Sequence, residues 1–458
     1  MLKPLAIALL ALGSPAFADT RVPASQAEIQ LGFVPVVKAV TPAVVNIYAR
    51  RVIEGRASPF ADDPFFGQLF QNFGAQRPRV ENSLGSGVIL GSDGIVVSNY
   101  HVVGQATDIR VVLNDRREFD ARVLLADEES DLAILKVDAG DLPALTLRDS
   151  ESVEVGELAL AVGNPFGVGQ TVSSGIVSGL ARSGTVTGNT RGYFIQTDAP
   201  INPGNSGGAL VDTNGRLIGI NTSILSRSGG SNGIGFAIPA TLVGQFVQQA
   251  RAGETVFQRP WAGVSGQPVT YDMAEGLGLR RAGGLILSDM HEASPFGAAG
   301  LAPGDVILAV GGREVNNPAE MIYRMTIAGL GTDLAVTALQ GGERREIAVP
   351  MRPAPDSPPR ATLTTGARAA VPGVTLSTIN PAVMAEYDLP LTLSGVLVED
   401  PGDIGARAGL RAGDVLRGIN GAAVTDSASA SAALEAARGR LALDVQRGQR
   451  RLTMRFRL

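Results

Sequence analysis

Cysteine is absent from this chain of 458 residues, which excludes a disulfide framework, a thiolate metal site and a cysteine nucleophile. Histidine occurs only twice, and the carboxylates do not cluster at the spacing of metal ligands, so a metal site has little support. The 39 Lys and Arg residues are scattered and are outnumbered by 44 Asp and Glu residues, which argues against nucleic-acid binding. No nucleotide-binding loop is present. We expect no metal and no cofactor, and we expect ordinary hydrophobic cores to stabilise about three domains.

The N-terminus carries an apolar run that follows Lys3 and ends near Ala16-Phe17-Ala18. The small-x-small pattern of these last three residues is typical of signal-peptidase cleavage sites. The run is too short to span a bilayer, so a membrane anchor is the weaker interpretation. We therefore expect residues 1–18 to be a cleaved signal peptide. We expect the exported chain to be soluble and to have no membrane span.

Short runs rich in Val, Ile and Leu, separated by Gly, Asn and Asp, follow one another from Val40 to Ile238. Runs of this kind with turn residues at short spacing indicate an all-β sandwich or barrel. Helical periodicity is strong only in pieces such as Pro239–Ala252. Further on, AGLAPGDVILAVGGREV at Ala299–Val315 matches AGLRAGDVLRGINGAAV at Ala408–Val424 at a constant offset of 109 residues. An internal match of this length predicts a duplicated domain.

Two irregular stretches interrupt this pattern. Residues 352–370 contain four prolines among polar residues, which predicts an extended, semi-rigid linker between the two copies. Residues 59–82 contain five phenylalanines among Asp, Gln, Gly and Pro; a buried core helix is one interpretation, but this composition favours a long surface loop. The predicted order is a signal peptide over 1–18, an N-terminal lead-in over 19–39, a first domain over 40–253 with the loop at about 52–82, a first repeat domain over 260–353, a linker over 354–370 and a second repeat domain over 371–458.

The stretch TDAPINPGNSGGAL, Thr197–Leu210, places Ser206 among glycines and prolines. Serine is a poor nucleophile unless a base takes its proton and donors stabilise the oxyanion that forms. The glycines at positions 204, 207 and 208 leave the backbone bare and tolerate the conformations of a tight loop. We therefore predict that the backbone N–H groups of Gly204 and Ser206, with Asn205 in support, form an oxyanion hole. A plain turn is the alternative interpretation of this motif when it stands alone.

A candidate base and a candidate acid precede the serine in the chain. His101 lies in VVSNYHVV, where an apolar strand ends, and Asp131 in ESDLAILKV adjoins another apolar strand. A capped strand end is the alternative for His101. His291 occurs in the first repeat, and its counterpart in the second is Asp400, so we interpret His291 as a surface loop residue. Four other aspartates between His101 and Ser206 lie among charged residues and are expected to be solvated; they are Asp108, Asp115, Asp120 and Asp127.

These residues predict general-base catalysis, in which His101 takes the Ser206 proton and Asp131 orients and stabilises the imidazole before water hydrolyses the acyl-enzyme. The chain order His, Asp, Ser, the motifs NYHVV, DLAILKV and GNSGGAL, and the tandem C-terminal repeat resemble the HtrA/Deg family of periplasmic serine proteases. The resemblance extends over nearly the whole mature chain. It implies a mainly β fold, with a chymotrypsin-like domain of two six-stranded β-barrels followed by two PDZ domains. It also places His101 and Asp131 in the first barrel and Ser206 in the second.

The resemblance implies an activity as well. The chain would be an ATP-independent serine endopeptidase that degrades misfolded or damaged periplasmic proteins, with PDZ domains that bind substrate C-termini. It would assemble as a homotrimer or a multiple of trimers, and the Phe-rich loop looks like the regulatory loop of the family. A non-catalytic periplasmic holdase chaperone or PDZ scaffold is the alternative function. An esterase or lipase is a weaker alternative, because those folds place Ser, Asp and His in that order on an α/β pattern.

Two further sites follow from the resemblance alone. The first is similar to the strand and loop that pair with substrate and line its side-chain pocket; its residues are Thr222, Ser223, Ile224, Leu225 and Ser226. Because Pro200 stands where trypsin-like relatives carry an Asp, we expect a small apolar pocket. The second is similar to the PDZ loop whose backbone N–H groups hold a peptide carboxylate; its residues are Trp261, Ala262, Gly263, Val264 and Ser265. In the second copy Pro372 removes one such donor, so we expect that copy to serve assembly rather than peptide capture.

Overall fold

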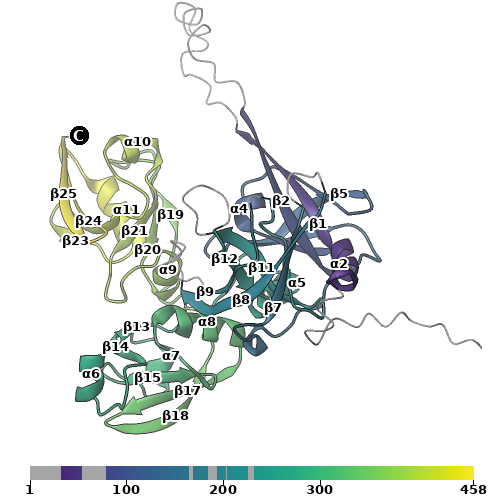
Figure 1. The fold of residues 1–458 in the computed structure, drawn as a ribbon. Helices are drawn as coiled ribbons and strands as arrows, with labels where there is room; N and C mark the ends of the chain where they lie inside the picture. The colour runs from purple at the N-terminus through teal and green to yellow at the C-terminus, as the bar shows by residue number, and fades with distance from the viewer. Residues whose placement is uncertain are drawn as a thin grey trace, which may run out of the picture. The chain divides into compact units, whose positions relative to one another are not determined.

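The structure is a computed structural model that describes residues 32–53, 79–164, 169–183, 193–202, 204–224 and 232–457. The predicted signal peptide and most of the loop predicted at about 52–82 lie outside these ranges. The chain divides into two compact units, one formed mainly by residues up to Val256 and the other mainly by residues from Phe257 onward (Figure 1). Each unit is described by itself below.

The first unit contains two closed β-barrels of six strands each, which confirms the predicted double-barrel fold. The strands of the first barrel are β1 (Val44–Ile53), β2 (Arg79–Gly91), β3 (Ile95–Ser98), β4 (Asp108–Val112), β5 (Glu118–Asp127) and β6 (Leu132–Val137). The strands of the second are β7 (Leu158–Gly163), β8 (Thr171–Ser183), β9 (Tyr193–Thr197), β10 (Ala209–Val211), β11 (Leu217–Ile224) and β12 (Gly235–Pro239). Their orders are β1-β2-β3-β6-β5-β4 and β10-β11-β12-β9-β8-β7. Closure pairs every strand on both sides, so neither barrel exposes a sheet edge.

The barrels form where the sequence has short β-branched runs and tight turns. All four residues of β3, the run IVVS, are buried, as are five of the six residues of β6. The turn Ser92-Asp93-Gly94 joins β2 to β3, and Gly94 adopts a positive φ of 95° there. A side chain at this position would be strained, because L-residues rarely adopt that backbone conformation.

One helix contacts strands of both barrels. It is α5 (Ala240–Arg251), which matches the helical periodicity expected over Pro239–Ala252. Its buried side chains lie at helical spacing and pack against β5, β6, β11 and β12; they include Leu242, Val243, Phe246 and Val247. Two shorter helices of this unit are α2 (Val34–Val40) and α4 (Tyr100–Val103). Among the residues that the structure describes, no helix has both the length and the apolar character to cross a membrane.

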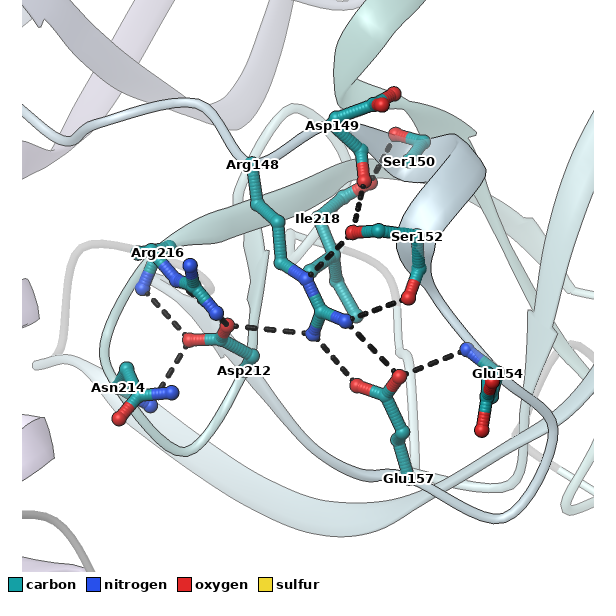
Figure 2. Close-up of polar contacts among 10 residues, drawn as sticks. All are labelled: Arg148, Asp149, Ser150, Ser152, Glu154, Glu157, Asp212, Asn214, Arg216 and Ile218. Atoms are coloured by element: carbon teal, nitrogen blue, oxygen red, sulfur yellow. Dashed lines mark hydrogen bonds and ion pairs between the residues drawn. The ribbon is translucent and has the colours of Figure 1, made fainter.

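An ion-pair network anchors the segment that joins the two barrels (Figure 2). The guanidinium of Arg148 donates to both carboxylate oxygens of Glu157, at 2.5 and 2.9 Å, and to Asp212 at 3.3 Å. Asp212 is buried and also accepts from the backbone N–H groups of Asn214 and Arg216, both at 2.9 Å. Because Asp212 directly follows β10, the network fixes the end of the strand that begins after the Ser206 loop.

Stability should therefore depend on pH through Glu157. The hydrogen bond from Arg148 holds the pKa of the Glu157 carboxyl below its usual value. A lowered pKa in the folded state means that the carboxylate stabilises the fold fully above its unfolded pKa, and that this contribution disappears as pH falls through the folded pKa. Glu157→Gln is expected to lower the melting temperature at neutral pH, by an amount that shrinks towards zero at acidic pH.

The measurement is a series of thermal unfolding curves for the wild type and the variant from roughly pH 3 to pH 7. Glu118→Gln is the matched control, because Glu118 pairs with Arg110 at 3.1 Å with both side chains more than half exposed. An exposed pair of this kind contributes little to stability, so the control should track the wild type throughout. A melting-temperature difference for Glu157→Gln that stayed constant over the whole series would contradict the role given to its charge.

The second unit contains the two repeat domains, each built on one β-sheet with short helices. The first has β13 (Val264–Pro268), β14 (Leu285–Met290), β15 (Val306–Val310), β16 (Arg313–Glu314), β17 (Asp333–Gln340) and β18 (Glu343–Pro350), with α6 (Tyr271–Gly276), α7 (Pro295–Ala298) and α8 (Pro318–Ala328). The second has β19 (Leu363–Thr364), β20 (Thr375–Thr378), β21 (Val396–Asp400), β22 (Val415–Ile419), β23 (Ala422–Ala423), β24 (Arg440–Arg447) and β25 (Arg450–Arg457), with α9 (Pro381–Glu386), α10 (Gly402–Arg407) and α11 (Ser427–Ala436). Their sheet orders are β13-β14-β15-β17-β18 and β19-β20-β21-β22-β24-β25.

The two copies use the repeated motif in the same way. Gly300 and Gly409 follow α7 and α10 with φ of 93° and 91°, and each leads into the buried strand β15 or β22. The copies differ before their first shared strand. Residues 354–370, predicted as an extended, semi-rigid linker, contain β19, which pairs with β20 and so belongs to the second sheet. Extended backbone suits a linker and a strand equally, and here it forms a strand.

Candidate active site

Ser206 lies on the loop between β9 and β10, in the second barrel. Backbone hydrogen bonds hold the loop against β11: Gly207 N–H donates to the Asn221 carbonyl at 2.8 Å, and Asn221 N–H donates to the Gly208 carbonyl at 2.9 Å. Gly208 N–H closes the turn by donating to the Asn205 carbonyl at 2.9 Å. The backbone on either side of the serine is therefore fixed, while its own side chain stays partly exposed.

Two of the loop glycines are required by packing rather than by substrate access, which corrects the expectation from the sequence. Gly207 is buried with φ of 83°, and a Cβ there would lie 2.1 Å from the Ser86 carbonyl oxygen. A Cβ on Gly208 would lie 2.3 Å from the Val162 carbonyl oxygen. The loop thus touches backbone of both barrels at positions where no side chain fits. Gly204, with φ of 98°, is the glycine of this loop that stays partly exposed.

Ser86 on β2 connects the first barrel to this loop, and no motif in the sequence distinguishes it from other serines. It is fully buried, its N–H donates to the Ser206 carbonyl at 2.9 Å, and its hydroxyl donates to the Gly204 carbonyl at 2.6 Å. The same hydroxyl accepts from the backbone N–H of Asn164 at 2.8 Å. Ser86 therefore fixes two of the three peptide units that surround the nucleophile candidate.

His101 and Asp131 meet in the first barrel. His101 is on α4, and its Nδ1 lies 2.9 Å from each carboxylate oxygen of Asp131. The backbone N–H of His101 donates to the same carboxylate at 3.0 Å. Asp131 adopts a positive φ of 54°, and the buried side chain of Asn99 donates to its carbonyl at 2.9 Å. These contacts fix the carboxylate against one edge of the imidazole, whose ring remains half exposed.

Thr222 connects the acid to the serine. Its hydroxyl donates to Asp131 Oδ2 at 2.5 Å, and its backbone carbonyl accepts from Ser206 Oγ at 3.0 Å. The sequence placed Thr222 in the substrate-binding strand, and it missed the bond to the acid because 91 residues separate the two positions. Because a hydroxyl has one proton, the Ser206 hydroxyl is directed at Thr222 and not at the imidazole in this structure.

Some backbone N–H groups of the Ser206 loop already donate a hydrogen bond, and others do not. Asn205 N–H donates to the Asn202 carbonyl at 3.0 Å, so the expected support from the Asn205 amide is not available in this structure. Its side-chain oxygen accepts from Thr171 Oγ1 at 3.0 Å. Among the described residues, none accepts a hydrogen bond from the N–H groups of Gly204 or Ser206. Those two amides are the donors left for an oxyanion.

A cavity of about 590 Å³ borders the imidazole on the first barrel. Its walls come from β1, β2, α4 and the turn before β6. The lining residues are Ala49, Arg51, Ser83, Tyr100, His101, Val102, Gln105, Ala106, Glu128 and Asp131. Two of these lining residues interact, since Arg51 donates a hydrogen bond to the Gln105 side chain. The imidazole is thus reachable from a space large enough for a peptide side chain.

The remaining predicted substrate residues are placed only in part. Ser223 and Ile224 belong to β11, which pairs with β12 through a register shift between Asn221 and Ser223. Leu225 and Ser226 lie outside the described residues. Asp198, the acid nearest to Pro200, accepts from the backbone N–H of Ile176 at 2.7 Å and so serves the fold of β8.

In the first repeat domain, residues that follow β14 hydrogen-bond to the predicted carboxylate loop. Ser294 Oγ donates to the Ala262 carbonyl at 2.6 Å, and His291 N–H donates to the Gly263 carbonyl at 2.9 Å. The rings of Trp261 and His291 pack edge to face with centroids 5.5 Å apart. His291, interpreted from the sequence as a surface loop residue, is thus half-buried and supports this loop. Val264 and Ser265 begin β13, opposite Met290 and Asp289 of β14.

Comparison with known families agrees with this architecture. Residues 85–220 match the model of a trypsin-like peptidase domain, and residues 263–351 and 395–447 each match a PDZ domain. The chain is 38% identical over 409 residues to a probable periplasmic serine endoprotease, DegP-like, of Halomonas elongata, covering 86% of this chain and 85% of the relative. It is 38% identical over 394 residues to the periplasmic pH-dependent serine endoprotease DegQ of Escherichia coli, covering 84% and 82%. A solved structure, the HtrA-type protease AlgW with decapeptide, superposes with a TM-score of 0.53 at 38% identity, covering 70% of this chain and 99% of that one.

Proposed function

The chain belongs to the family of DegP- and DegQ-like periplasmic serine endoproteases, and from this premise we propose that His101, Asp131 and Ser206 carry its peptide-bond hydrolysis. The observation that carries the proposal is one connected set of hydrogen bonds. It runs from His101 Nδ1 to the Asp131 carboxylate, from there to the Thr222 hydroxyl, and from the Thr222 carbonyl to Ser206 Oγ. The three proposed catalytic groups are therefore connected by hydrogen bonds that extend from the first barrel to the second.

The proposed reaction follows from the donors and acceptors in this set. The Ser206 hydroxyl turns from the Thr222 carbonyl to His101 Nε2, which takes its proton as Oγ attacks the peptide carbonyl carbon. The N–H groups of Gly204 and Ser206 stabilise the oxyanion, since both lack an acceptor among the described residues. His101 then passes the proton to the leaving amine, and water repeats the sequence on the acyl-enzyme. Asp131 stays ionised and stabilises the imidazolium.

We propose that substrates are captured by the first PDZ domain and cleaved in the protease domain. The domains extend over 40–253 and 260–353, with the second PDZ domain following the linker region. Unfolded or damaged proteins are the proposed substrate class, because they expose C-terminal peptides for a PDZ loop and extended backbone for a cleft. Residues 222–226 would pair with that backbone and favour small aliphatic side chains. A periplasmic location completes the proposal, in keeping with the relatives' names. Cleavage of residues 1–18 and assembly as a homotrimer or a multiple of trimers are proposed with it.

A fluorophosphonate probe tests the assignment of the nucleophile. The probe phosphonylates an activated serine Oγ with loss of fluoride, so mass spectrometry of a digest identifies the modified residue. We expect the adduct on the peptide that contains Ser206, and we expect the matched variant His101→Ala to be labelled far more slowly because it lacks the base. An adduct on another serine would overturn Ser206, and equal labelling of His101→Ala would overturn the proposed base.

A further inference from the structure

The peptide groove differs between the two PDZ domains. A PDZ ligand adds as an antiparallel strand beside the strand that follows the carboxylate loop. In the first domain that strand is β13, and β14 is its one neighbour in the described sheet, so its outer edge is open. In the second domain the equivalent strand is β20, which has β21 on one side and β19 on the other. We infer that the second groove is a peptide-binding site whose ligand is the chain's own segment Arg360–Thr365.

The segment follows β20 in the manner of an added peptide. Leu363 and Thr364 pair antiparallel with Leu376 and Thr375. Beyond these pairs, the Thr378 N–H donates to the Arg360 carbonyl at 2.7 Å. The side chains interact across the strands as well, because the hydroxyls of Thr364 and Thr375 lie 3.0 Å apart. The whole length of β20 is therefore covered on the side where a ligand would add.

At the carboxylate loop, Thr365 takes the donors that a ligand's C-terminus would need. Gly373 N–H donates to the Thr365 carbonyl at 3.0 Å, and Val374 N–H donates to the Thr365 hydroxyl at 2.9 Å. Pro372, the preceding residue of the loop, has no N–H to offer. The Thr365 hydroxyl also donates to the Val371 carbonyl at 2.8 Å. An internal carbonyl and hydroxyl thus stand in for the two oxygens of a ligand carboxylate.

The opposite wall of the groove, helix α11, also contacts the segment and the loop that follows it. Ser427 Oγ, at the start of α11, donates to the Ala361 carbonyl at 2.6 Å. Ala370 N–H donates to the Leu434 carbonyl at 2.9 Å, and the Leu363 side chain packs against the buried core of the domain. The segment therefore has backbone pairing on β20, an apolar anchor and contacts to α11, as a bound peptide would.

The first residue of the segment and the residues just before it are bound to the same domain. Asn380 Nδ2 donates to Asp356 Oδ1 and to the Pro358 carbonyl, both at 2.6 Å, and Arg360 pairs with Glu386 at 2.5 Å. A competing C-terminal peptide would have to displace all of these contacts together. External C-termini therefore engage the first PDZ domain alone, and the second is closed by its own linker. This inference deepens the substrate-capture part of the proposed function and does not depend on the catalytic residues.

Because the chain has no cysteine, a designed pair tests the position of the segment cleanly. Thr364→Cys with Thr375→Cys is introduced into full-length protein that also carries Ser206→Ala, and the folded protein is oxidised. Directly opposed residues on antiparallel strands have the spacing that a disulfide needs. We expect an intramolecular disulfide, which lowers the mass of the intact protein by about 2 Da and which a reducing agent reverses. Thr364→Cys with Thr453→Cys is the matched control, because Thr453 is on β25 and pairs with Asp444 of β24.

The number of peptides bound per chain is then measured on the same protein before and after oxidation. The probe is a fluorescein-labelled decapeptide that ends in an aliphatic residue. We expect one peptide per chain in both states. Two peptides per chain, a loss of sites on oxidation, or failure of the designed pair to form a disulfide would each overturn the inference. Absence of peptide binding in both states, with the disulfide formed, would instead refute the first PDZ domain as the receptor and leave the closed second groove supported.

Discussion

Asp131→Asn is expected to lower kcat for casein cleavage by about 10⁴-fold, with little change in KM or in melting temperature. The Asp131 carboxylate faces three donors: the His101 backbone N–H, His101 Nδ1 and the Thr222 hydroxyl. A carboxylate accepts all three, whereas an amide must present its NH₂ group to at least one of them. The amide therefore favours the imidazole tautomer with its proton on Nε2, which cannot take the Ser206 proton.

The control for this change is Asp138→Asn, which removes a carboxylate from the surface of the same barrel. Asp138 pairs with Arg122 at 3.0 Å, and both side chains are mostly exposed, so its loss should leave kcat within twofold of the wild type, roughly the scatter expected of a surface charge. Initial rates measured over a range of casein concentrations separate kcat from KM. An Asp131→Asn enzyme that kept a tenth or more of the wild-type kcat, a loss of at most about 1.4 kcal/mol of transition-state stabilisation, would refute the orienting role.

The architecture was predictable because its signals are local. Short β-branched runs with turn residues between them predict barrels, and two copies of one motif at a fixed offset predict a duplicated domain. His101, Asp131 and Ser206 also stood out, because each is a chemically capable residue at the end of an apolar strand or in a glycine-rich loop. The structure brings His101 and Asp131 into contact and links both to Ser206 through Thr222.

The supporting contacts were not predictable, because they join positions far apart in sequence. Ser86 and Gly204 are 118 residues apart, and a serine in a strand gives no sign that its hydroxyl reaches another barrel. The role of Thr365 is hidden in the same way. The stretch TLTT among prolines has the composition of an extended linker, and its pairing with β20 depends on the loop that returns the chain beside it. The composition of this segment predicts an extended backbone, but it does not predict which strand the segment pairs with.

Gly207→Ala is expected to lower kcat/KM by at least about 100-fold, because the loop must move for a side chain to fit. The added Cβ would lie 2.1 Å from the Ser86 carbonyl oxygen and 2.6 Å from Ser98 Oγ. Ser86 is buried in β2, and its backbone cannot shift without disturbing the barrel. The Ser206 loop must therefore move instead. A movement of about 1 Å at the nucleophile is enough to produce a loss of this size.

Backbone strain alone would give a different result, and a matched glycine separates the two causes. Gly253 has a φ of 92°, close to that of Gly207, but a Cβ there meets nothing within 4 Å. Gly253→Ala therefore carries the conformational cost of roughly 1–2 kcal/mol without the clash, and it should lower the melting temperature while leaving kcat/KM unchanged. If both variants lost the same stability and both kept full activity, contact between the loop and Ser86 would not be what positions Ser206. If only Gly207→Ala lost activity, the fit of one loop against the neighbouring barrel would be the physical basis of the serine's position.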